Sequence, residues 1–133
     1  MAREQSGDAL EAFRRYTQAF SSLDPVAAAR HFHEPAISIT PDRVVALPDA
    51  AAVVREYEGV MAQLRTAGYA RTDFTSLAER RLADDLAVVT AVAAWKKESG
   101  EEMRRFGMTY TLRRTGGDWH IVVLAVHDPL PDR

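Results

Sequence analysis

The stretch TGGDWHIVVLAVHDP (115–129) carries the clearest structural signal in this chain. Two glycines beside an aspartate are typical of a tight hairpin turn. The alternating run that follows indicates a β-strand, which ends at the Asp-Pro pair. Because the side chains of a strand point alternately to its two faces, this run divides into two rows. One row holds Trp119, Ile121, Val123, Ala125 and His127, and the other holds His120, Val122, Leu124 and Val126.

Three more runs of strand character precede this one. Residues 69–82 are polar and resemble an edge strand, residues 86–97 are nearly continuous in apolar side chains, and residues 102–114 lead into the glycine turn. A nearly continuous apolar run is typical of a central strand that is covered on both faces. Turns at 84–85 and 99–100 are short, so we expect consecutive strands to pair in an antiparallel meander.

The first half of the chain has helical periodicity. Residues 6–23 place apolar side chains at steps of three and four, which predicts an amphipathic helix. An Asp-Pro pair opens a second, short helix over residues 24–32, and a Pro-Asp pair opens a third over residues 49–66. Two short alternating runs, 36–40 and 44–47, lie between these helices and are expected to form strands.

Helices that come first and strands that come second favour an α+β fold. In such a fold the helices pack on one face of an antiparallel sheet. The 133 residues suit a single domain spanning residues 1–133. Apolar residues make up 47% and charged residues 27%, as expected for a soluble globular protein.

The composition also argues against several classes of function. A formal net charge of −2 predicts no nucleic-acid partner, and the absence of cysteine excludes disulfides, thiolate nucleophiles and zinc–thiolate sites. No apolar run approaches the roughly 18 residues of a membrane span, and the N-terminus lacks the apolar core of a signal peptide. We therefore expect a cytoplasmic protein that does not bind membranes. No glycine-rich phosphate loop, nucleophile-elbow serine or helical zinc motif is present, so we expect no cofactor.

The apolar strand at 86–97 is a candidate wall of a pocket. Ala91 and Ala93 share one face with Trp95. Small side chains on a central strand leave volume beneath the helices, which a large aromatic side chain can close off as a cavity. The alternative is that the two alanines only let a helix approach the sheet closely. The sequence leaves both interpretations open.

The histidines are weaker candidates. His127 continues an apolar row and titrates near neutral pH, so it is a candidate proton donor or acceptor. The alternative, a strand-end histidine bonded to the backbone or to Asp128, is the commoner case. His31 and His33 lie two residues apart near a helix end without a clear third ligand, so we expect no metal site.

Three segments together resemble a known family. They are AFRRYTQAFSSLDPVAAARHF (12–32), the helix at 49–66 and GGDWHIVVLAVHD (116–128). Their order is similar to that of the nuclear-transport-factor-2-like superfamily, which includes SnoaL-like polyketide cyclases and ketosteroid isomerases. The resemblance implies a cone-shaped, curved antiparallel sheet with three N-terminal helices on its concave face. It also implies a homodimer formed through the outer face of the sheet.

The resemblance extends to individual positions. Tyr16 matches the helix tyrosine that donates a hydrogen bond to the substrate oxygen in ketosteroid isomerases. Thr40 falls where those enzymes carry the proton-shuttling aspartate, and threonine cannot act as that base, so their mechanism is not expected here. By position, the last-strand row with Val123, Ala125 and His127 should face the cone. The expected ligand-binding residues are Tyr16, Tyr57, Ala91, Ala93, Trp95, Thr109, Val123 and His127.

Three functions are compatible with these residues. The first is a pocket that binds a small hydrophobic molecule without catalysis. The second is a cofactor-independent acid–base enzyme of isomerase, cyclase or dehydratase type, with Tyr16 polarising a carbonyl oxygen and His127 moving a proton. The third is a dimerisation module without a ligand. If the cone is open, Tyr16, Trp95, His127 and Tyr57 should line it. Replacing Tyr16 by phenylalanine should then hardly change stability but should weaken the binding of a carbonyl ligand.

Overall fold

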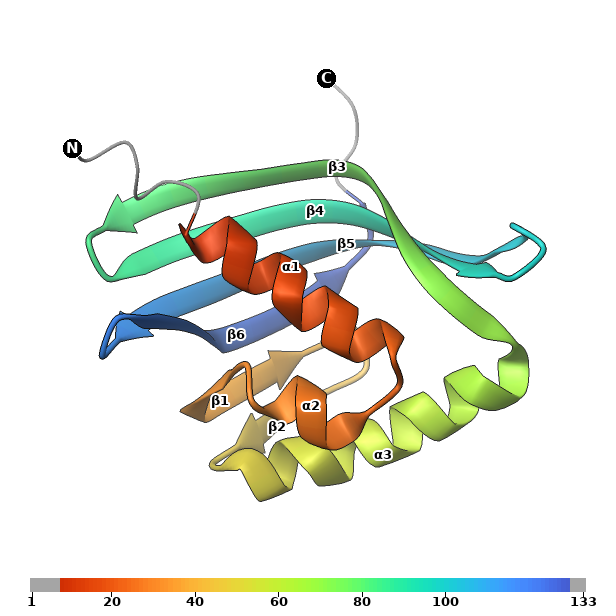
Figure 1. Cartoon of the computed structure of the whole chain (residues 1–133), viewed down its shortest axis with the longest axis horizontal. Helices are drawn as coiled ribbons and strands as arrows, with labels where there is room; N and C mark the ends of the chain where they lie inside the picture. The colour runs from red at the N-terminus through yellow and green to blue at the C-terminus, as the bar shows by residue number, and fades with distance from the viewer. Residues whose placement is uncertain (1–7, 130–133) are drawn as a thin grey trace.

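The computed structural model describes residues 8–129, which form a curved six-stranded sheet with three helices (Figure 1). The helices are α1 (Asp8–Ser21), α2 (Pro25–Ala29) and α3 (Ala50–Ala67). The strands are β1 (Phe32–Ile39), β2 (Val44–Leu47), β3 (Tyr69–Ala83), β4 (Leu86–Lys97), β5 (Glu102–Thr115) and β6 (Asp118–His127). The predicted α+β class is confirmed. Within residues 8–129, no helix combines the length and the apolar character needed to cross a membrane.

Local capping interactions set the helix ends. The side chain of Asp24 accepts hydrogen bonds from two backbone N–H groups in the first turn of α2, at 3.1 and 3.2 Å. The side chain of Asp49 accepts one from the first turn of α3, at 3.0 Å. Both aspartates thereby satisfy donors that have no partner inside the helix. α3 ends at Gly68, whose φ of 93° is a conformation that only glycine adopts without steric cost.

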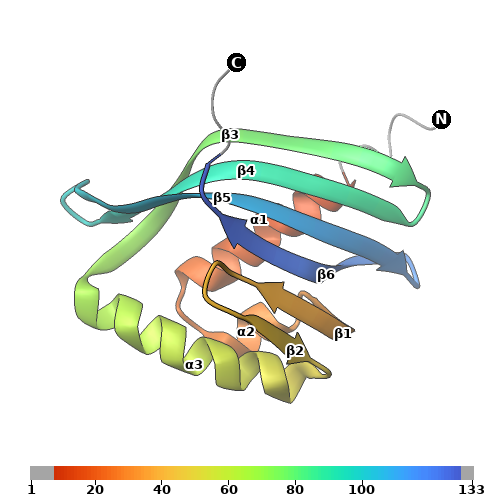
Figure 2. The ribbon, with the colours of Figure 1, turned by 180° about the vertical axis from the view of Figure 1, so that it is seen from behind.

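Strands β3 to β6 form the predicted meander. β3 pairs with β4, β4 with β5 and β5 with β6, each time antiparallel. Seen from behind, the long strands curve together, with α1 behind them and α3 below them (Figure 2). The outer, convex face of the sheet is therefore not covered by any helix of residues 8–129.

β1 differs from the prediction of a wholly antiparallel sheet. It pairs antiparallel with β2 but parallel with β6, so the sheet is mixed, in the order β2-β1-β6-β5-β4-β3. A short hairpin forces neighbouring strands to run in opposite directions, whereas β1 and β6 are separated by most of the chain. β1 also begins at Phe32, earlier than the expected residue 36, because α2 has only five residues.

The helices cover the concave face unevenly. α1 lies across the sheet and contacts β3, β4 and β6, whereas α3 packs mainly on α2 and also contacts β1, β2 and β3. The ring of Phe13 on α1 is 5.7 Å from that of Phe74 and 5.4 Å from that of Tyr110, measured between ring centres. α1 therefore fills one end of the concave face with a packed core, and the other end is bounded by α3.

Candidate functional site

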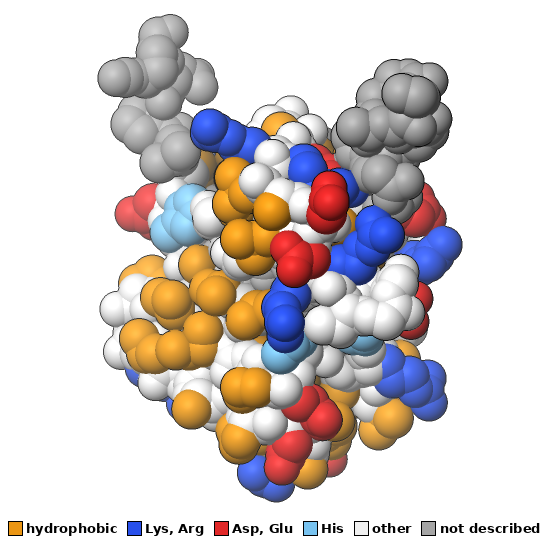
Figure 3. Space-filling view, turned by 90° about the vertical axis from the view of Figure 1, so that its left-hand side faces the viewer, with side chains coloured by type: hydrophobic (Ala, Val, Ile, Leu, Met, Phe, Trp, Pro, Cys, Tyr) orange, Lys and Arg blue, Asp and Glu red, His pale blue; other side chains and the backbone are white. Residues whose placement is uncertain are grey.

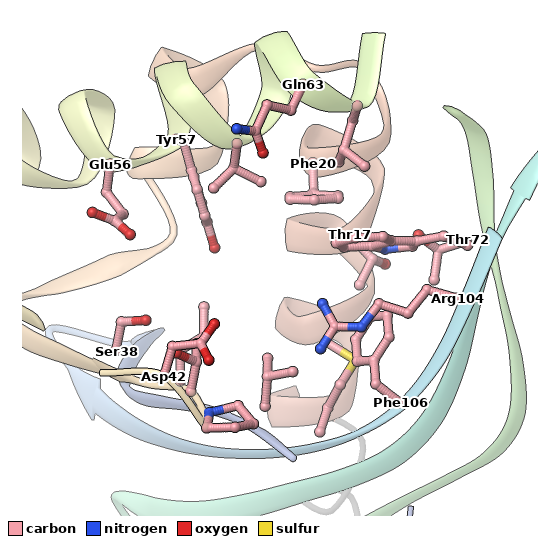
Figure 4. A pocket seen from close by; sticks show the side chains of 18 of the residues that line it. Thr17, Phe20, Ser38, Asp42, Glu56, Tyr57, Gln63, Thr72, Arg104 and Phe106 are labelled. Atoms are coloured by element: carbon pink, nitrogen blue, oxygen red, sulfur yellow. The ribbon is translucent and has the colours of Figure 1, made fainter. Parts of the chain in front are cut away.

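A cavity of about 650 Å³ lies between α1, α3 and the inner face of the sheet (Figure 4). Apolar side chains from all three elements contribute much of its wall. They include Phe20, Leu64, Trp95, Phe106, Met108 and Leu124. A volume of this size, with apolar walls and a few polar groups, is typical of a site for a small organic molecule.

Three tyrosines meet at the cavity wall. Tyr16 comes from α1, Tyr57 from α3 and Tyr110 from β5, and all three are buried. The hydroxyl oxygens of Tyr16 and Tyr57 are 2.5 Å apart, and the hydroxyl of Tyr110 also hydrogen-bonds that of Tyr16. Burial raises the pKa of Tyr16 to about 12, although its hydrogen bonds with the other two phenols act in the opposite direction. Burial likewise raises the pKa values of Tyr57 and Tyr110 well above 10, so the cluster is protonated at neutral pH.

The tyrosine cluster has a hydrogen-bond donor to spare. Its three hydroxyls carry three protons, and the two contacts between them use two of these protons. A buried O–H without an acceptor costs about 1–3 kcal/mol, so the third proton favours an oxygen placed in the cavity. The hydroxyl of Tyr57 points into this space (Figure 4). The cluster can therefore donate a hydrogen bond to a carbonyl or hydroxyl oxygen.

Two carboxylates lie on the side of the cavity formed by β1, the β1–β2 turn and α3 (Figure 4). Glu56 Oε2 accepts a hydrogen bond from Arg43 Nη2 at 2.7 Å. Asp42 lies in the turn, and Ser38 is buried on β1 beside it. The hydroxyl of Thr40 also lines the cavity, but it donates to the carbonyl oxygen of Arg43 at 3.3 Å and so helps to close the turn.

The structure brings three of the predicted ligand-binding residues together. Tyr16, Tyr57 and Trp95 all line the cavity. Ala91 and Ala93 share the inner face of β4 with Trp95, but they are buried and are not among the cavity-lining residues. Because α1 packs directly on β4, the alternative interpretation applies to them, namely that small side chains let the helix approach the sheet.

A β-bulge in β6 overturns the predicted facing of the last strand. Thr111 pairs with Val123, but the next residue of β5 pairs with Ile121, so Val122 is an extra residue. A bulge of one residue exchanges the two faces beyond it. Trp119 and Ile121 point inward as predicted, and beyond the bulge the inward residues are Leu124 and Val126. The prediction that Val123, Ala125 and His127 face the cone is therefore wrong.

His127 and Thr109 lie on the outer face of the sheet and contact each other there. The hydroxyl of Thr109 is 2.8 Å from His127 Nε2, and His127 Nδ1 is 2.7 Å from the carbonyl oxygen of Asp128. The ring covers Gly107, where an added Cβ would come within 2.6 Å of His127 Cε1. With Nδ1 donating to the carbonyl oxygen, Nε2 accepts from the threonine hydroxyl. His127 thus cannot move a proton inside the cavity, and Thr109 cannot line it.

The other predicted candidates lie elsewhere. His31 is half-buried near His120, and desolvation lowers its pKa, with the nearby charges of His120 and two arginines acting in the same direction. His33 is partly buried, and its Nε2 lies 3.1 Å from Arg113 Nη1, so this nitrogen accepts from the guanidinium. Within residues 8–129, histidine and carboxylate side chains do not gather in threes as metal ligands would.

Several cavity residues were not among the ligand-binding residues expected from the sequence, namely Ser38, Asp42, Glu56, Arg104 and Tyr110. Alternation along β5 contains a signal for two of them, because Arg104 and Tyr110 belong to the same row as Met108. For Asp42 and Glu56 no such signal exists, since a turn aspartate and a helical glutamate have the same sequence pattern whether or not a cavity lies beside them.

Comparison with known proteins identifies the fold. A family model described as NTF2-like protein (DUF6841) matches residues 4–129. Among curated proteins, none matches this chain. The fold is similar to that of an NTF2-like protein with a cystatin-like fold from Novosphingobium aromaticivorans, at a TM-score of 0.77 and 19% identity, covering 94% of this chain and 82% of that one.

Two further solved structures have the same fold. One is a proposed dehydratase of the NTF2-like family from Streptomyces avermitilis, at a TM-score of 0.75 and 16% identity, covering 98% of this chain and 100% of that one. The other is a proposed calcium/calmodulin-dependent protein kinase II association domain from Xanthomonas campestris, at a TM-score of 0.69 and 16% identity, covering 100% of this chain and 90% of that one. At these identities the likeness establishes the fold alone.

Proposed function

The chain belongs to the NTF2-like proteins of family DUF6841, and on that premise we propose that its cavity binds a small, mostly apolar molecule that carries an oxygen acceptor. The observation that carries this proposal is the buried tyrosine cluster, whose spare O–H faces a cavity of about 650 Å³. Apolar contact with the walls would supply most of the affinity, and the phenol would orient the ligand. Of the ligand-binding residues expected from the sequence, we propose that Tyr16, Tyr57 and Trp95 contact the ligand.

We expect 2-acetylnaphthalene, an apolar ketone, to bind with a dissociation constant in the micromolar range, because its rings match the walls and its carbonyl accepts from Tyr57. Replacing Ser38 by tryptophan fills the cavity from β1 and should weaken binding about tenfold or more. Replacing Tyr57 by phenylalanine should weaken it about fivefold. Isothermal titration calorimetry measures all three values.

Ser99→Trp is the matched control, because residue 99 lies in the exposed turn between β4 and β5 and an indole there meets only solvent. Its affinity should equal that of the unmodified protein. Equal affinities of the Ser38→Trp and Ser99→Trp variants would show that the ketone binds outside the cavity.

Acid–base catalysis is a second candidate, favoured by the two carboxylates that share the cavity with the phenols. The dehydratase proposal for the similar Streptomyces avermitilis protein points in the same direction. In this scheme Glu56 accepts a proton from the carbon next to a carbonyl, and Tyr57 donates a hydrogen bond to the oxygen that becomes negative. In D2O, the methyl protons of bound 2-acetylnaphthalene should then exchange faster than in buffer, and Glu56→Gln should abolish the acceleration. Exchange at the buffer rate would exclude this candidate for the ketone.

The outer face of the sheet is the proposed site of homodimerisation. Val88, Val92, Val123 and Ala125 lie on this face and are only partly buried within one chain. Hydrophobic side chains gather at the left of Figure 3, on the side of the molecule that is at the back in Figure 1. An apolar face of a sheet without a helix over it favours association with a second copy, and the similar Xanthomonas campestris protein is a proposed association domain.

Val123→Glu should dissociate the dimer, raising its dissociation constant about 100-fold, because each interface would bury two unpaired carboxylates. Sedimentation velocity at micromolar concentration measures the change. Val26→Glu is the control, since Val26 is 52% exposed on α2, on the helical side of the molecule. Sedimentation of the unmodified chain as a monomer would contradict the proposal.

A further inference from the structure

Arg104 is a cation that faces the cavity from β5. It lies opposite Trp95 in the β4–β5 pairing and two residues before Phe106, so the three side chains share the inner face of the sheet. The central carbon of its guanidinium is 5.2 Å from the centre of the Phe106 ring and 5.9 Å from that of Trp95. These contacts hold the guanidinium against the aromatic wall, where it points into the cavity (Figure 4).

The arginine differs from its charged neighbours because no acidic side chain of residues 8–129 pairs with it. Arg105, next in sequence but on the outer face, bonds Glu102 at 2.8 Å. Arg43, on the far side of the cavity, bonds Glu56 at 2.7 Å. The N–H groups of Arg104 are thus available to a ligand, and their planar fork matches a carboxylate better than any neutral group.

The charged side chains are distributed unevenly around the cavity. Asp42 and Glu56 lie on one side, and Arg104 lies on the other (Figure 4). Because Arg43 offsets the charge of Glu56, the first side keeps the negative charge of Asp42, whereas the second side is positive. A negative group is therefore favoured on the second side. We propose that Arg104 selects ligands that carry a carboxylate, which it binds at the β5 side while the apolar body fills the cavity. This inference rests on the proposed binding function and specifies its ligand class as small aromatic or aliphatic acids.

The test compares two probes of equal shape, 6-acetyl-2-naphthoic acid and 6-acetyl-2-naphthamide, by isothermal titration calorimetry at pH 7. The acid should bind about fivefold more tightly than the amide, as expected for one ion pair with an exposed arginine. Arg104→Gln should reduce this preference to about one. Arg105→Gln, the adjacent outward-facing control, should retain it. Because ion pairs near solvent are screened, 1 M salt should also reduce the preference.

The possible outcomes separate this inference from the proposed function. Equal affinity for acid and amide, or loss of the preference in the Arg105→Gln variant as well, would overturn the role of Arg104 and leave cavity binding intact. A preference that depends on Arg104 but survives in Ser38→Trp would place the acid on the surface and overturn the inference. If neither probe binds, both proposals fail.

Discussion

Replacing Phe13 by alanine is expected to lower the free energy of unfolding by about 3–5 kcal/mol, a large part of the roughly 5–15 kcal/mol that stabilises a domain. Phe13 is fully buried, and its ring contacts those of Phe74 on β3, Tyr110 on β5 and Tyr16 on α1. Truncation removes the apolar contacts and leaves a cavity between α1 and the sheet. Neither element can move enough to fill it. Chemical denaturation monitored by circular dichroism measures the loss.

Val26→Ala is the control for this prediction, because Val26 is 52% exposed and its truncation removes little buried surface. Its free energy of unfolding should stay within about 0.5 kcal/mol of the unmodified value. A Phe13→Ala variant as stable as Val26→Ala would mean that α1 does not contribute to the core.

Alkaline conditions are expected to destabilise the fold through the tyrosine cluster. The pKa of Tyr16 is raised from 10 to about 12 by burial, so the stability that depends on its protonation is fully present below pH 10. It is lost as the pH rises from 10 to about 12, and for Tyr16 alone it amounts to about 2–3 kcal/mol. Burial raises the pKa values of Tyr57 and Tyr110 as well, so their contribution has the same sign. Denaturation curves at pH 9 to 12 measure the loss.

Few other groups contribute to the pH dependence of stability in this range. The chain has no cysteine and only two lysines, Lys96 and Lys97, and arginine does not titrate in this range. The absorbance of ionised tyrosine should rise together with unfolding, because three of the four tyrosines belong to the cluster. A stability that is constant between pH 10 and 12 would contradict the burial of the three phenols.

The variant Tyr16→Phe tests the cluster itself. The sequence places Tyr16 on an apolar stripe. From this position alone, replacing it by phenylalanine is expected to leave the stability of the fold nearly unchanged. The structure reverses this expectation, because Tyr57 and Tyr110 both hydrogen-bond the hydroxyl of Tyr16. The variant should lose about 1–3 kcal/mol at pH 7 and depend less steeply on pH above 10.

Much of the scaffold was predictable because its signals are local. The aspartate caps of α2 and α3, the glycine that ends α3 and the turns of the meander each depend on a few neighbouring residues. The inner rows of β4 and β5 also follow from simple alternation, which places Ala91, Ala93 and Trp95 on one face. Within the site, Tyr16 and Tyr57 were predictable because they lie on the apolar stripes of their helices.

The sequence by itself thus determined the order and type of the elements, their caps and the residues available to the concave face. Tertiary structure alone decided that β1 pairs parallel with β6, that a bulge at Val122 turns His127 outward, and that three phenols share one cavity. It also decided that Glu56 has a cationic partner and Arg104 has no acidic one within residues 8–129. Caps and periodicities depend on hydrogen bonds and steric contacts within a few residues, whereas register and charge pairing depend on segments that only folding brings together.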